Sequence, residues 1–149
     1  MGELVTIATE PAGSTYRALL DFALSTESLF SLTWRTRTNY DPEAATIAAA
    51  LEPDLVAESQ SDRWPGTQLL QPDAVVRLYR LSPSAREVLA SAEHLYAWQA
   101  PARPEDLAFY TPDRSVWLGS TAHEADSFLY PVATSVDDVV AKAGLTIDQ

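Results

Sequence analysis

The spacing of hydrophobic positions predicts helices and short strands that follow one another along the chain. Apolar residues at helical spacing predict helices over residues 14–25, 42–51, 83–97 and 135–143. Alternating or short apolar runs predict strands at residues 29–37, 74–81, 107–111, 115–121 and 127–133, and weaker patterns mark residues 3–9 and 54–59 as further candidates. Helices with one apolar stripe and strands with two unlike faces pack as two layers. The pattern therefore predicts one α+β domain over residues 1–149, with a mainly antiparallel sheet of about five or six strands and helices packed against it.

Start and stop residues support the helix boundaries. Asp41 and Ser82 each precede a proline, which is the arrangement of an N-cap followed by proline at the first helical position. Ser135 is a third N-cap, and Gly144 is placed to end the last helix in a left-handed conformation. Residues 60–73 match no regular pattern, and we expect them to form the longest loop. Trp64 is expected to hold this loop down, and the alternative is that it lines a cleft.

Residues 29–37 show the clearest alternation between apolar and polar side chains. Phe30, Leu32 and Trp34 point to one face, while the intervening positions point to the other. Arg35 and Arg37 are then expected on one solvent-exposed face of the strand. Solvated arginines are the favoured interpretation, and a clamp for an anion or a carboxylate is the alternative.

Composition narrows the class of function. The 149 residues include 46% hydrophobic residues, no cysteine, and 21 acidic against 10 basic residues, giving a net charge of −11. The missing cysteines exclude disulfides, thiolate metal ligands and cysteine nucleophiles. The negative charge disfavours nucleic acid and anionic membranes, and permits a basic partner. With no leader-like or membrane-spanning stretch, the sequence predicts a cytoplasmic protein, and nine arginines against one lysine indicate a GC-rich bacterial genome.

Residues 104–131 gather the densest set of functional side chains. These 28 residues hold five carboxylates, one of the two histidines, two tyrosines and a tryptophan. The predicted turns at 111–114 and 122–126 lie at opposite ends of a three-stranded meander, so carboxylates near the second turn share one end. We therefore predict a negative rim for protein binding, with either of two aromatic anchors; its residues are Glu105, Asp106, Glu124, Asp126, and Trp98 or Tyr110.

His123 belongs to the pattern His-Glu-x-Asp, which lacks the paired histidines that place two zinc ligands on one helical face. We expect no metal and no cofactor. An alternative ligand site would join His123 to Arg35 and Arg37 in a cleft between residues 60–73 and residues 104–131.

Several segments resemble a group of uncharacterised small bacterial proteins, some of which carry a sporulation-protein label. The resembling segments lie within residues 74–131 and are Leu78–Ser84, Leu95–Trp98, Pro104–Tyr110, Trp117–Ser120 and His123–Glu124. The resemblance implies a shared α+β module without an established activity, and it suggests a gene near toxin or conflict systems.

Three functions remain open from the sequence. The first is a binding or inhibitory protein, such as an immunity protein that neutralises a basic toxin or effector; acidity would steer such a pair together. The second is a small ligand-binding enzyme with the cleft described above, although no nucleophile motif is present. The third is a structural or assembly subunit. The sequence leaves the oligomeric state open.

Overall fold

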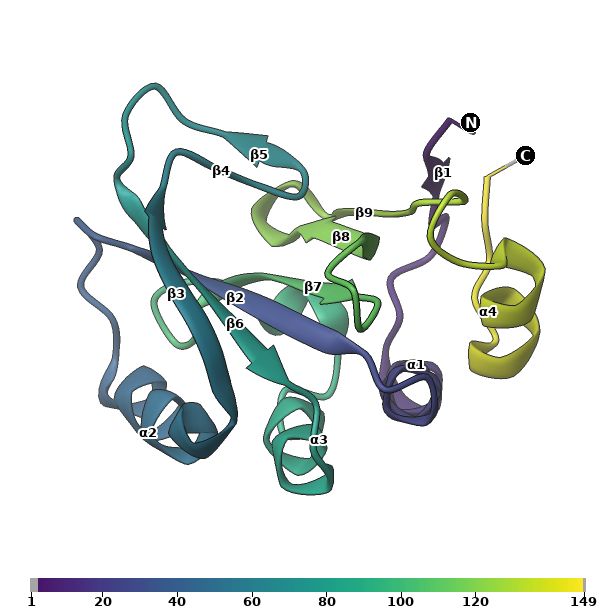
Figure 1. The fold of residues 1–149 in the computed structure, drawn as a ribbon, viewed down its shortest axis with the longest axis horizontal. Coiled ribbons are helices and arrows are strands. Elements are labelled where there is room, and N and C mark those ends of the chain that lie inside the picture. Colours follow the sequence, from purple (N-terminus) through teal and green to yellow (C-terminus); the bar gives the residue numbers. More distant parts are fainter. Residues whose placement is uncertain (1–2, 149) are drawn as a thin grey trace.

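Seven strands form one antiparallel sheet in the order β1-β9-β8-β7-β2-β6-β3 in the computed structural model, which describes residues 3–148 (Figure 1). The strands are β1 (Val5–Thr6), β2 (Leu29–Arg35), β3 (Leu55–Ser61), β6 (Ala74–Arg80), β7 (Glu105–Tyr110), β8 (Val116–Thr121) and β9 (Asp126–Leu129). The predicted antiparallel α+β architecture is confirmed, with seven strands in place of five or six. The weakly patterned segments 3–9 and 54–59 both join the sheet, as its two edge strands.

Helices cover one face of this sheet (Figure 1). They are α1 (Gly13–Ser25), α2 (Pro42–Leu51), α3 (Pro83–Ala90) and α4 (Val136–Ala143). Between them and the sheet lies a core that includes Phe30, Leu32, Tyr79, Phe109 and Leu118, each at most 1% exposed. Among residues 3–148 no helix is long and apolar enough to cross a membrane.

Helix α3 ends at Ala90, seven residues before the predicted end. The next residues hydrogen-bond to the segment before α1 and leave the helical path: Gly13 donates to the carbonyl of Glu93, and Leu95 donates to the carbonyl of Pro11. Glu93 takes a left-handed backbone conformation, with φ of 71°. A tertiary contact therefore overrides the apolar helical spacing that continues to residue 97.

The predicted helix caps are largely confirmed. The hydroxyls of Ser82 and Ser135 each accept a hydrogen bond from a backbone N–H in the first turn of the helix that follows, at 3.0 and 3.3 Å. Gly144 ends α4 with φ of 76°. Asp41 occupies the N-cap position of α2 but makes no capping hydrogen bond with its side chain.

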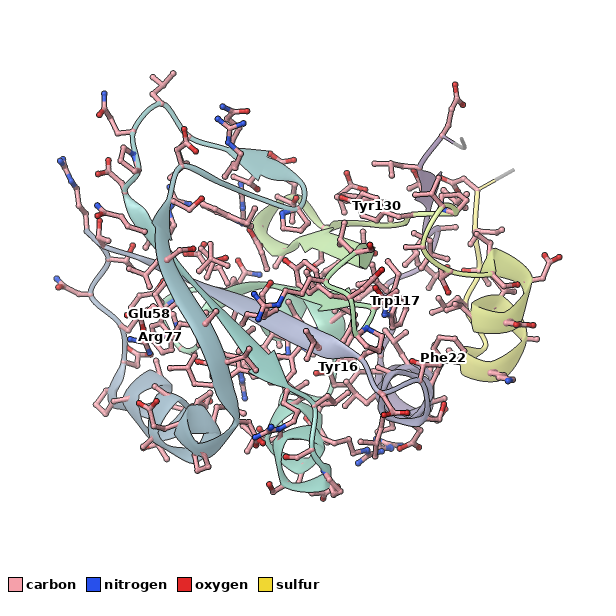
Figure 2. All side chains as sticks on the ribbon, viewed as in Figure 1. Tyr16, Phe22, Glu58, Arg77, Trp117 and Tyr130 are labelled. Atoms are coloured by element: carbon pink, nitrogen blue, oxygen red, sulfur yellow. The ribbon has the colours of Figure 1, made fainter. Side chains whose placement is uncertain are left out.

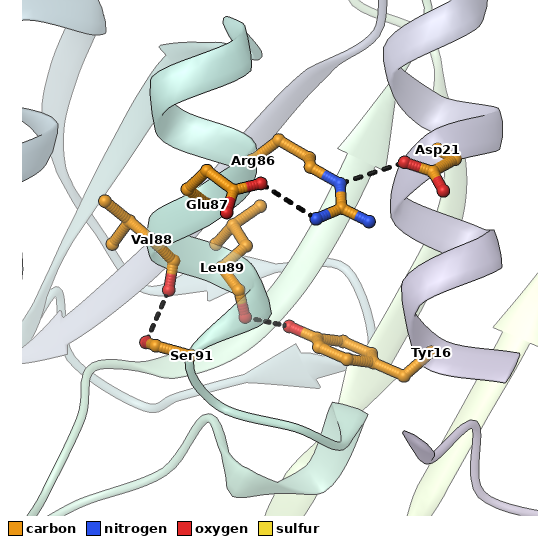
Figure 3. Close-up of polar contacts among 7 residues, drawn as sticks. All are labelled: Tyr16, Asp21, Arg86, Glu87, Val88, Leu89 and Ser91. Carbon is orange, nitrogen blue, oxygen red and sulfur yellow. Dashed lines mark hydrogen bonds and ion pairs between the residues drawn. The ribbon is translucent and has the colours of Figure 1, made fainter. Parts of the chain in front are cut away.

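Polar contacts join α1 to α3 at the base of the helical layer (Figure 3). The buried hydroxyl of Tyr16 donates to the carbonyl oxygen of Leu89 at 2.7 Å and accepts from Nε1 of Trp98 at 2.9 Å. At the surface, Arg86 pairs with Asp21 across the two helices at 2.9 Å. Burial raises the pKa of Tyr16, so its hydroxyl remains protonated and keeps donating.

The loop predicted at 60–73 contains a short hairpin, β4 (Arg63–Trp64) and β5 (Thr67–Gln68), on the opposite side of the sheet from the helices (Figure 1). At its turn, Gly66 has φ of 90°. A Cβ there would lie 2.6 Å from Oγ1 of Thr121 and 2.8 Å from the ring of Phe128. The hairpin therefore packs tightly on β8 and β9, and glycine is what permits that approach.

The polar face of β2 is less exposed than its alternation predicts. Ser31 and Thr33 are 1% and 0% exposed. The Oγ of Ser31 lies 3.0 Å from the hydroxyl of Tyr110, whose side chain comes from the neighbouring strand β7. The expectation of a solvent-exposed face is thus wrong for these two positions, because side chains from adjoining elements cover them.

Candidate functional site

The four carboxylates of the predicted rim come from the same end of the β7–β8–β9 meander. Asp126 pairs with Thr121 where β8 and β9 meet, and Oδ1 of Asp106 accepts a hydrogen bond from the backbone of Ala122 at 2.9 Å. Glu105 and Asp106, however, are only 8% and 3% exposed. The prediction of one exposed rim is therefore wrong for these two residues. Glu124 is exposed and Asp126 half-buried, and these two remain at the surface.

Asp106 is a structural junction between three segments of the chain. Its Oδ2 accepts a hydrogen bond from Nε1 of Trp64 in the hairpin at 2.8 Å, while its Oδ1 binds the start of the short helix Ala122–Glu124. Trp64 is 6% exposed, which confirms the prediction that it anchors the loop. Asp106 itself is held at φ of 61°, in the left-handed region that aspartate tolerates better than most residues. Burial raises the pKa of its carboxyl group, and the bond from Trp64 opposes that rise.

Tyr40, which follows β2, links Glu105 to Arg35 at the end of that strand. The hydroxyl of Tyr40 donates to Oε2 of Glu105 at 3.2 Å and accepts from the backbone N–H of Arg35 at 2.8 Å. Burial raises the pKa of Glu105, and the adjacent charge of Asp106 raises it further, whereas Arg35 and the bond from Tyr40 lower it. Burial also raises the pKa of Tyr40 to about 12, so the tyrosine is the donor in this pair at neutral pH.

The residues of the alternative ligand site do not converge in an open cleft. Arg35 lies with its guanidinium 5.7 Å from the centre of the Trp64 ring, and Arg37 is exposed in the turn after β2. His123 is 51% exposed, with Nε2 3.6 Å from Glu124. The space between the hairpin and the strands, where the cleft was expected, is a packed contact through Trp64 and Gly66. Within residues 3–148 no three histidine or acidic side chains gather where they could hold a metal ion.

The two candidate aromatic anchors lie in different environments. Trp98 is 0% exposed and belongs to the core, with its indole N–H bound to Tyr16. Because it is buried, Trp98 cannot serve as a surface anchor, and that prediction is wrong. The apolar spacing of the sequence does not distinguish a buried tryptophan from an exposed one. Tyr110 is half-buried on the face of the sheet that the helices leave free.

Tyr110 lines a groove of about 270 Å³ on this open face of the sheet. The strand register explains the groove, because Leu78 on β6 lies between Ser31 on β2 and Ala57 on β3. These facing side chains are small or half-exposed, so the sheet surface is hollow between them. The complete lining is Ser31, Ala57, Ser59, Val76, Leu78, Tyr110 and Arg114.

The groove was not predicted, although the sequence of β6 holds one signal for it. Residues 74–81 have apolar side chains at Val76 and Leu78 as well as at Val75 and Tyr79, so β6 is apolar on both faces. Such a strand has either a second covered face or an exposed apolar surface. Here one face belongs to the core and the other forms the floor of the groove.

Tyr110 and Arg114 are the aromatic and the cationic side chain of the groove, and Tyr130 lies outside its lining. Tyr130 packs edge-on to Phe128, with ring centres 5.8 Å apart, and Figure 2 shows Tyr130 near β9. Burial raises the pKa of Tyr130, and the neighbouring Tyr110 raises it further. Arg114 is exposed in the turn between β7 and β8.

Within residues 3–148, Arg114 forms no ion pair. Tyrosine and arginine are enriched at protein contact sites, and here Tyr110 and the unpaired Arg114 line a groove with an apolar floor. Comparisons with protein-family models, with curated proteins and with solved structures found no significant match for this chain.

Proposed function

We propose that this chain is a small binding protein that recognises a protein partner through the open face of its sheet. The observation that carries the proposal is the groove beside Tyr110, on the sheet face that the helices leave uncovered. Its floor is apolar at Val76 and Leu78, and its border includes Tyr110 and the unpaired Arg114. An apolar side chain of a partner would fill this groove and displace water from it.

The charge of the chain favours a basic partner. A net charge of −11 gives a long-range field that accelerates encounter with a positive protein. Glu124 and Asp126, which remain at the surface, contribute to that field. An immunity protein that neutralises a basic toxin or effector combines these properties, and it is the form of inhibitory binding that we favour.

The test compares capture of host proteins by three forms of the purified chain: wild type, Leu78→Arg, and the control Ala49→Arg. Both substitutions add the same side chain, but Ala49 is exposed on α2 in the helical layer. The proposal expects one basic protein to be retained by wild type and by the control, and lost with Leu78→Arg. Equal retention by all three forms, with unchanged thermal unfolding, would remove the groove as the contact surface.

A further inference from the structure

The two edges of the sheet differ in whether the chain covers them. Beside β1, the C-terminal segment covers the outer edge: the backbone N–H of Asp148 donates to the carbonyl of Thr6 at 2.9 Å, and Ile7 pairs with Ile147 in an antiparallel bridge. At the opposite edge, β3 pairs with β6 and with no other strand of residues 3–148. One edge is therefore closed, while the seven-residue β3 offers unpaired backbone groups.

The free edge lies directly beside the groove. Ala57 and Ser59 of β3 line it together with Val76 and Leu78 of β6. A strand added next to β3 would lie about 4.8 Å from it and would place every second side chain over the open face. Those side chains would border the groove. Val56, an apolar residue of β3 that is 41% exposed, would gain a neighbour as well.

The charges along this edge favour a basic occupant. Residues 52–62 carry four carboxylates and neither lysine nor arginine. Neighbouring arginines pair with three of them, Arg80 with Asp54, Arg77 with Glu58 and Arg63 with Asp62, so the edge keeps a small excess of negative charge. Glu58, at the centre of β3, is 48% exposed and shares its carboxylate with Arg77 at 2.7 Å (Figure 2). A second copy of this chain, paired antiparallel about the centre of β3, would place Glu58 opposite Glu58, and like charges directly opposite are destabilising. An extended basic segment has the complementary charge.

We infer that the free edge of β3 binds an extended segment of the partner protein as an additional strand. Apolar side chains of that segment lie over the groove, and basic side chains lie opposite Glu58. Main-chain hydrogen bonds to β3 supply affinity, while the groove and the carboxylate select the side chains. This inference rests on the proposed function, and it specifies the conformation and the chemistry of the partner's binding segment.

The experiment uses a library of short synthetic peptides in which lysine alternates with valine, leucine or tyrosine, with binding to the wild-type chain measured by fluorescence polarisation. Two N-methylated versions of the best binder are then made, one methylated on the odd-numbered amides and the other on the even-numbered amides. An added strand turns one set of N–H groups toward β3 and the other toward solvent. We expect one version to lose binding and the other to keep it.

Two variants test the charge. Glu58→Lys is expected to weaken the peptide about two- to fivefold, the range that follows from one cross-strand charge pair. Glu87→Lys is the matched control, because it makes the same charge change and also loses an arginine partner. Glu87 lies on α3, in the helical layer and away from β3. The control should bind as the wild type does.

Absence of any binder, equal loss from both N-methylated versions, or equal effects of the two variants would overturn the inference. Capture of a host partner that still depends on Leu78 would then leave the proposed function standing without strand addition. Loss of that dependence would instead remove the proposed function itself.

Discussion

Replacing Asp106 by alanine is expected to destabilise the fold strongly, because its buried carboxylate accepts two hydrogen bonds from distant segments. The substitution removes both acceptors of the junction and leaves two buried donors, Nε1 of Trp64 and the N–H of Ala122, without partners. Each orphaned donor costs about 1–3 kcal/mol, so the sum is about 2–6 kcal/mol. Burial of the Asp106 carboxylate raises its pKa, so removing that charge offsets part of the loss. We expect a net loss of about 2–4 kcal/mol.

A double-mutant cycle isolates the contribution of the tryptophan hydrogen bond. Trp64→Phe keeps an aromatic ring in the hairpin anchor but removes the N–H that binds Asp106. The cycle compares wild type, Trp64→Phe, Asp106→Ala and the double variant by urea unfolding at pH 7, followed by far-ultraviolet circular dichroism. The expected coupling is about 1.5–3 kcal/mol, the range for a hydrogen bond to a charged group. Effects that add to within about 0.5 kcal/mol would refute the junction.

Three further outcomes follow. Gly66→Ala should lower the unfolding free energy by about 2–4 kcal/mol in urea titrations, because its Cβ would collide with β8 and β9 at a positive φ, and a neutral effect would contradict the packed hairpin. Burial raises the pKa values of Glu105 and Asp106 above their ordinary values of 4.5 and 3.8, so the stability that these groups contribute is fully present below the ordinary pKa values and is lost as pH rises through the raised ones. Glu105→Gln should therefore flatten the dependence of the unfolding free energy on pH. An unchanged slope would contradict this. Charge reversal at Glu124 and Asp126 should slow association with a basic partner more than it speeds dissociation, and high salt should mask the difference. Association rates that change with neither the substitutions nor the salt concentration would exclude these residues from the contact.

Local sequence signals predicted the elements well, because their causes are local. Ser82 and Ser135 cap the helices that follow them, and Gly144 ends the last helix, as side-chain chemistry at single positions dictates. The alternation of Phe30 and Leu32 with polar neighbours located β2 within two residues of its end. The number of strands was underestimated since edge strands bury few side chains and carry a weak pattern.

The candidate site was harder to predict, because burial depends on elements far away in the sequence. Glu105 and Asp106 resemble surface carboxylates in the sequence. Trp64, 42 residues before Asp106, and Tyr40, 65 residues before Glu105, hold them in the fold. Trp98 follows a predicted helix and Tyr110 precedes a predicted turn, and only packing decides that Trp98 joins the core. The groove required the register of three strands, which places Leu78 beside Ser31 and Ala57.

The most direct test of the open-face contact is photo-crosslinking in host extract. A photoreactive phenylalanine derivative replaces Tyr110 in one form of the chain and Ala49, on the helical layer, in another. We expect one discrete crosslinked protein from position 110, competed by unlabelled wild type but not by Leu78→Arg, and no such product from position 49. The same product from both positions, or crosslinking at 49 alone, would contradict recognition through the open face of the sheet.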